Sequence, residues 1–258
     1  MSTISAIAVN TFKETIRDRV LYAILVFAIF MCLLSIVFGS LSIGNNTKIM
    51  LDFGLTSICI FGGILSIFIG TSLVFKEIDR RTIYVILSKP IDRWEFILGK
   101  FFGLSVTLTL IVTLMSLIFM GMLLLYNISM HDLYLDFASI VLIMFELYLI
   151  TALSILFSSF STPLLSMVFV GALWVIGHFN PVMLNMAQFA QSEYVLQLVT
   201  ILHYILPDLS IFNIRNNIDN LDYILPLSDL FIKMLYGVIY SAIVLMIAVF
   251  AINRKEFN

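Results

Sequence analysis

Few residues of this chain are of types that do chemistry, and Glu146 is the one in the most unusual setting. It is the only acid that lies well inside a long apolar segment. If that segment crosses a membrane, a charge near its centre costs roughly 2.5–3.5 kcal/mol on insertion scales. The Glu146 side chain should therefore face protein or water, or be protonated. Three interpretations stay open: a contact in a ligand pathway, a hydrogen bond at a seam between subunits, and a structural glutamate. Tyr148, Thr151 and Ser154 are nearby candidates for its partners.

Catalytic motifs are missing from the sequence. There is no G-x-S-x-G and no H-E-x-x-H, which are the patterns of common hydrolases and zinc peptidases. Gly99-Lys100 lacks the upstream glycine and the following Ser or Thr of a P-loop, so this segment cannot hold nucleotide phosphates. We therefore expect a chain that is not an enzyme.

Metal-binding residue types are present, but their spacing matches no known site. His178 and His203 lie near Met183 and Met186, and imidazole and thioether groups both bind copper. The 13 methionines of so apolar a chain are expected to pack rather than to bind metal. We expect no metal site, and we expect the two cysteines to be buried thiols.

The segment 76–100 is the most informative part of the sequence. It holds six of the 14 Lys and Arg residues. Apolar side chains recur among its charges as on an amphipathic helix, and Pro90 then disfavours helix at Lys89. A short charged helix of this kind suits docking to a cytoplasmic partner, whereas the plainer interpretation is a loop that only fixes topology.

The rest of the chain must place these residues in a membrane. Hydrophobic residues make up 61% of it and charged residues 12%, against about 25% charged in soluble domains. About twenty apolar residues cross a bilayer, and six such runs occur. They lie at about 20–42, 53–75, 101–126, 136–157, 164–180 and 229–252. Runs of this length favour helices over a barrel, so we expect an all-α polytopic membrane protein with one domain, 1–258.

The charges predict the orientation of these runs. With both termini in the cytoplasm, 11 of the 14 cations lie on the cytoplasmic side, as the positive-inside rule requires. Residues 2–19 carry an apolar stripe at four-residue spacing and predict an amphipathic elbow helix along the inner leaflet. The segment 181–228 is largely apolar with a narrow polar stripe, and it predicts external re-entrant or interfacial helices before the last span.

This architecture and the 76–100 segment together resemble the permease subunit of type-two ABC exporters. The branch most similar is the one named for maturation of multicopper enzymes, including nitrous oxide reductase, and for gliding motility. The similarity is closest in the order E…T…LLSKP…R…GK, matched by Glu77, Thr82, the apolar stretch to Leu87, Ser88-Lys89-Pro90, Arg93 and Gly99-Lys100. Arg80-Arg81 departs from it, because the family often has a small residue before the threonine.

The resemblance implies a half-transporter that works with a cytoplasmic ABC ATPase subunit in two copies. ATP and Mg would be held by that ATPase, and no cofactor by this chain. The segment 76–100 would be the coupling helix, with apolar side chains entering a groove on the ATPase and charged ones forming pairs at its rim. The residues assigned to this docking surface are Glu77, Arg80, Arg81, Thr82, Ile83, Tyr84, Leu87, Lys89 and Arg93.

The resemblance also implies partners and a location. We expect a second permease copy, giving a homodimer, a periplasmic or surface accessory protein, and contact with lipid but not with nucleic acid. The location would be the inner membrane of a prokaryote. The function would be ATP-driven export or mechanical signalling across that membrane. The alternative is an ion-gradient-driven secondary transporter or channel, but one intramembrane acid and no internal repeat argue against it.

Overall fold

The computed structural model describes residues 2–40, 46–79, 92–125, 130–187, 193–215 and 225–254, and within these ranges it contains helices and no strands. The elements are α1 (Thr3–Ile16), α2 (Arg19–Ser40), α3 (Asn46–Asp79), α5 (Arg93–Leu125), α6 (Met130–Phe160), α7 (Pro163–Ala187), α8 (Glu193–Ile205), the 3-10 helix η1 (Leu209–Phe212) and α9 (Leu227–Arg254). Six of these helices are long and apolar enough to cross a membrane: α2, α3, α5, α6, α7 and α9. The predicted all-α class with six spans is confirmed.

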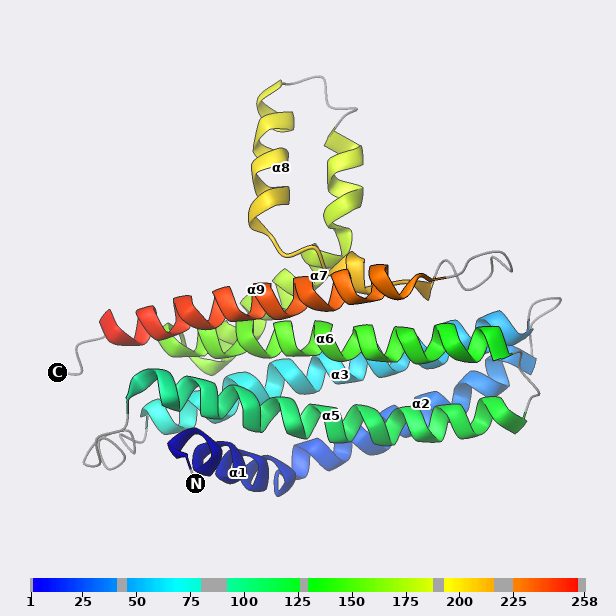
Figure 1. Cartoon of the computed structure of the whole chain (residues 1–258), viewed down its shortest axis with the longest axis horizontal. Coiled ribbons are helices and arrows are strands. Elements are labelled where there is room, and N and C mark those ends of the chain that lie inside the picture. The colour runs from blue at the N-terminus through cyan, green and yellow to red at the C-terminus, as the bar shows by residue number, and fades with distance from the viewer. Residues whose placement is uncertain are drawn as a thin grey trace.

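The long helices form a bundle with α3 and α6 at its centre (Figure 1). In their most apolar stretches, 61% of the residues in α3 and 67% in α6 are buried, against 22% in α2 and in α7. Small residues let these two helices approach closely. Ser66 Oγ lies 2.9 Å from Thr151 Oγ1, and a Cβ atom at Gly70 would come 2.6 Å from Ser154 Cβ. The interior is therefore built around α3 and α6, and the other spans surround it.

Helix α1 precedes the first span and packs along the start of α5. Ser2 caps its first turn, since Ser5 N donates to Ser2 Oγ. The helix ends at Ile16, and Asp18 Oδ1 then accepts from Val20 N at the start of α2. Figure 1 shows the start of α1 at the same end of the bundle as the end of α9. We call this end of the bundle the terminal end and the opposite one the far end.

Several helices extend beyond the apolar runs that predicted them. Helix α5 begins at Arg93, ahead of the run that starts near 101, so the last part of the 76–100 segment belongs to this helix. Helix α7 continues through Pro181 to Ala187, past the run 164–180. In Figure 1 the last part of α7 stands beside α8, away from the long helices.

Most of the predicted docking surface lies outside the described residues. This applies to Arg80, Arg81, Thr82, Ile83, Tyr84, Leu87 and Lys89. Glu77 lies in the last turns of α3, but its side chain is not among those described. Arg93 is the one member of this set whose side-chain contacts are seen.

Candidate functional site

Glu146 lies at the centre of a polar cluster that joins three spans. Its side chain is only 1% exposed. The indole Nε1 of Trp174 on α7 donates to Glu146 Oε1 at 2.8 Å. The thiol of Cys59 on α3 lies 3.7 Å from both carboxylate oxygens. The carboxylate therefore faces the interior of its own bundle and links α6 to α3 and α7.

His178 completes this cluster from one turn beyond Trp174 on α7. Its Nδ1 lies 3.0 Å from the carbonyl oxygen of Trp174. Because a carbonyl oxygen only accepts, this contact makes Nδ1 the donor. The other ring nitrogen, Nε2, then faces Glu146 Oε1 at 3.5 Å. A proton between Nε2 and the carboxylate is required for these two atoms to attract each other.

Arg215 brings positive charge to the same cluster from the segment after η1. Its Nη1 donates to Thr56 Oγ1 on α3 at 2.7 Å. Its charge acts on both Cys59 and Glu146. A buried carboxylate needs such compensation, because taking an isolated charge out of water is very costly.

The cluster also has the composition of a transition-metal site. Ligand atoms of Cys59, Glu146 and His178 all lie within 4.8 Å of one another, and thiolate, carboxylate and imidazole are ligands of Zn²⁺. In this structure Trp174 also donates to the carboxylate, so these groups take part in an interhelical hydrogen-bond network. The expectation of no metal site stays a prediction.

The sequence did not identify these partners. The side chains suggested for Glu146 bond elsewhere: Tyr148 contacts Thr109 Oγ1 at 2.7 Å and Thr151 contacts Ser66. Ser154 donates to the carbonyl of Ile150. The hydrogen bond from Trp174 has no local signal in the sequence. Whether Glu146 also lines a pathway or a seam stays a prediction.

His203 has a separate role from His178. Its Nδ1 lies 2.9 Å from Asn180 Oδ1, and Asn180 Nδ2 donates to the carbonyl of His203. Asn180 lies on α7 and is fully buried. This pair fixes α8 against α7, so the two histidines do not meet in one site.

Arg93 lies at the terminal end of the bundle, where it connects α5 to α9. Its Nη1 donates to the carbonyl of Ile252 at 2.9 Å. The last carbonyls of a helix lack partners within it, and a cation there is favourable. Arg93 thus joins the first turn after the 76–91 segment to the last turn of α9. Its predicted contact with an ATPase is not tested by this arrangement.

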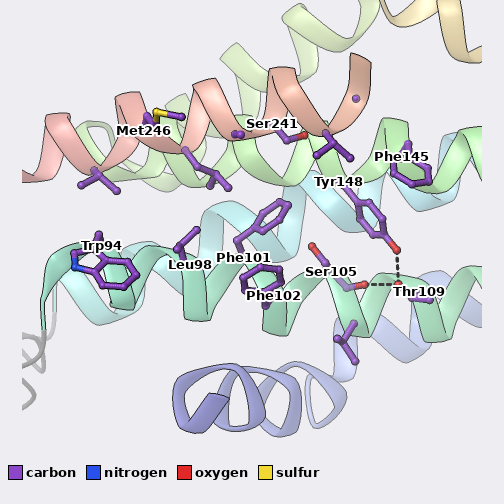
Figure 2. Close-up of a pocket in the computed structure, with 16 residues that line it drawn as sticks. Trp94, Leu98, Phe101, Phe102, Ser105, Thr109, Phe145, Tyr148, Ser241 and Met246 are labelled. Atoms are coloured by element: carbon purple, nitrogen blue, oxygen red, sulfur yellow. Dashed lines mark hydrogen bonds between the residues drawn. The ribbon is translucent and has the colours of Figure 1, made fainter. Parts of the chain in front are cut away.

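An elongated cavity of about 790 Å³ opens between α5 and α9, and Figure 2 shows the side chains that line it. We call it the α5–α9 slot. Its α5 wall runs from Trp94 to Thr109, and its α9 wall from Gly237 to Val249. Tyr148 from α6 lies at its inner part, where it reaches Thr109 (Figure 2). Among the described residues, none of those that line the slot is charged.

Comparison with known proteins identifies the family. The family model for ABC-2 family transporter proteins matches residues 5–257. No curated protein matches the chain. The six spans and the lack of a phosphate-binding motif agree with this match, which favours the ATP-driven class over an ion-gradient-driven carrier. The chain belongs to the ABC-2 transporter family, as a membrane component without an ATPase domain of its own.

Proposed function

We propose that this chain is the permease half of an exporter, coupling ATP hydrolysis on a separate ABC ATPase to export or to mechanical signalling across the membrane. The observation that carries the proposal is a family match over residues 5–257 in a six-span chain without a P-loop. ABC-2 permeases generally pair with an ABC ATPase, which would hold the ATP and Mg. The branch named for multicopper-enzyme maturation and gliding motility is proposed on the 76–100 segment alone.

The proposed orientation has the terminal end in the cytoplasm of a prokaryote. Eleven of the 14 cations then lie on that side, in agreement with the positive-inside rule. The start of α5 and the end of α9 meet there through Arg93 and Ile252. A displacement of the segment before α5 would therefore be transmitted to α9 through this hydrogen bond.

The proposed ATPase-docking surface is the 76–93 part of the coupling segment. Apolar side chains buried at an interface supply most of the binding energy, and charges at the rim adjust register and encounter rate. Tyr84 and Leu87 are the proposed apolar contacts, and Arg80, Arg81 and Lys89 the proposed rim charges.

Co-purification tests the proposal. The tagged full-length chain, extracted from host membranes in mild detergent, should recover an ABC ATPase. Replacing Tyr84 and Leu87 by Asp should abolish this recovery while membrane insertion stays intact, because a charge would enter the apolar contact. Ser88→Asp, in the same segment but outside the apolar stripe, is the matched control and should still recover the ATPase. Unchanged recovery with the Tyr84 and Leu87 variant would contradict the docking assignment.

A further inference from the structure

The α5–α9 slot has the dimensions of one membrane leaflet. Its α5 wall covers the 16 residues from Trp94 to Thr109, or about 22 Å at a helical rise of 1.5 Å per residue. Half of a bilayer, including its headgroup region, is about 20–22 Å thick. Trp94 is 45% exposed at the terminal end of the slot, and tryptophan is enriched at the membrane–water interface. The slot therefore extends from one membrane surface to about the mid-plane.

Polar links limit the slot at both of its ends. At the terminal end Arg93 bonds the carbonyl of Ile252, so α5 and α9 are joined there. At the inner end the Tyr148 hydroxyl lies 2.7 Å from Thr109 Oγ1. Between these two links α5 and α9 are separated by the cavity. Phe145 and Tyr148 of α6 also line it. The opening faces sideways, where a bilayer would be.

Small residues line both walls of the slot. Gly237, Ser241 and Ala242 belong to the α9 wall, and Ser105 and Thr109 belong to the α5 wall. Small residues on facing spans usually let the two helices come into contact, but here the space between them is left as a cavity. A second and more open depression, lined by α5 residues from Val106 to Leu117, adjoins the slot. The lining is almost wholly apolar, so an occupant gains contact area there without needing a charge partner.

The size of the slot selects among occupants. The slot offers about 790 Å³ over about 22 Å of length, which is a mean cross-section of about 36 Å², so a helix 10–12 Å in diameter would enter it only in part. A single hydrocarbon chain is narrow and elongated, as the slot is. We propose that the α5–α9 slot is a binding site for one hydrocarbon chain of an amphipathic lipid, whose headgroup lies beside Trp94 in the leaflet at the terminal end.

Photolabelling in vesicles tests this site. The full-length chain is reconstituted into phosphatidylcholine vesicles that contain a trace of phosphatidylcholine with a diazirine in one acyl chain. After irradiation, peptides from the α5 and α9 walls should carry saturable label, above the level on α2, although α2 is less buried than either helix. Ala242→Phe and Val106→Phe each narrow the slot from one wall, and each should lower this labelling about tenfold.

Two matched controls and a cross-link complete the test. Ile243→Phe and Leu124→Phe add the same ring on exposed positions outside the slot, and they should leave the labelling unchanged. Equal label on all spans, or no effect of Ala242→Phe and Val106→Phe, would overturn the proposal. A disulfide between copies through Val238→Cys would do the same, because a second copy would then occupy the slot. Labelling requires no ATP, so a failure of ATPase recovery would count against the proposed function and not against this site.

Discussion

Glu146 shows how a carboxylate is accommodated inside an apolar bundle. Trp174 and His178 from α7 and Cys59 from α3 surround it, and Arg215 adds a positive charge. Each group supplies a donor or a charge that water would otherwise provide. The structure therefore supports a role for Glu146 in holding α3, α6 and α7 together, and a role in transport needs separate evidence.

Substitution of Glu146 separates these roles. Glu146→Leu leaves the indole N–H of Trp174 without its acceptor, at roughly 1–3 kcal/mol for a buried group, and removes the carboxyl group that His178 Nε2 faces. Glu146→Gln keeps the size of the side chain and an oxygen that can accept from Trp174. We expect Glu146→Leu to lower the midpoint of thermal unfolding of the purified complex, and Glu146→Gln to lower it less. The ATPase activity of the partner subunit, measured in the complex, should survive in the Gln variant.

The control for this experiment lies one helical turn away. Ile150 is fully buried on α6, and Ile150→Leu conserves volume, so its cost should stay below about 1.5 kcal/mol. A Gln variant that keeps full stability but loses activity would show that Glu146 acts in the pathway. If both Glu146 variants match wild type, neither interpretation holds.

The partners of Glu146 could not be predicted from the sequence. Burial of Glu146 was predictable, because the cost of exposing a charge to lipid depends only on where the residue lies in its own apolar run. The partners depend on packing: Cys59 lies 87 residues away and Trp174 28 residues away. Side chains close in sequence, such as Thr151, were wrong candidates because they bond to α3 from a different turn of α6.

The contact of α1 with α5 depends on two glycines of α5, one turn apart. A Cβ atom at Gly99 would lie 2.7 Å from Ile7 Cβ, and one at Gly103 would lie 2.6 Å from the carbonyl oxygen of Ala8 and 2.7 Å from Thr11 Cβ. These distances are too short for real contacts, so only glycine permits this approach. Small residues at four-residue spacing are a common means of close helix contact in membranes.

An alanine at Gly103 tests this contact. We expect Gly103→Ala to force α1 away from α5 and to destabilise the protein by about 1–3 kcal/mol, because backbone and Cβ atoms of α1 cannot move aside easily. Gly121→Ala is the control on the same helix, since nothing lies within 4 Å of a Cβ there, and it should be neutral or stabilising by about 0.5–1 kcal/mol. Thermal unfolding measures both. Equal stability of the two variants would contradict the packing argument.

The elements themselves were largely predictable, whereas their ends were not. Six apolar runs predicted six spanning helices, because a bilayer crossing requires a fixed length of apolar helix. The start of α5 was misplaced because Arg93, Glu95 and Lys100 mark it as polar. In the structure Lys100 is only 1% exposed, and its ammonium lies 5.9 Å from the centre of the Phe96 ring. Its burial depends on packing within the bundle, which no local pattern reveals.

At the scale of the whole molecule, α8 and the last part of α7 stand away from the bundle (Figure 1). Their outer surfaces are strongly apolar: Met186 is 71% exposed, Tyr194 84% and Tyr204 80%. Among the described elements α8 packs mainly on α7, with the Asn180–His203 pair between them. We expect a permease without a nucleotide site of its own to work as one of two copies, and this projecting pair suits contact with the second copy.

The last prediction is that two permeases meet through this projecting pair of helices. Cysteine at Met186 or Tyr204 should form cross-links between copies in intact membranes, because both positions would face the second subunit. Phe231→Cys is the control on α9: it is 64% exposed but should face lipid and remain uncross-linked. Native mass measurement should find two permeases and two ATPases in each complex. A complex with a single permease and no distinct second one would refute the assembly, whereas cross-linking through Phe231 instead would place the seam on α9.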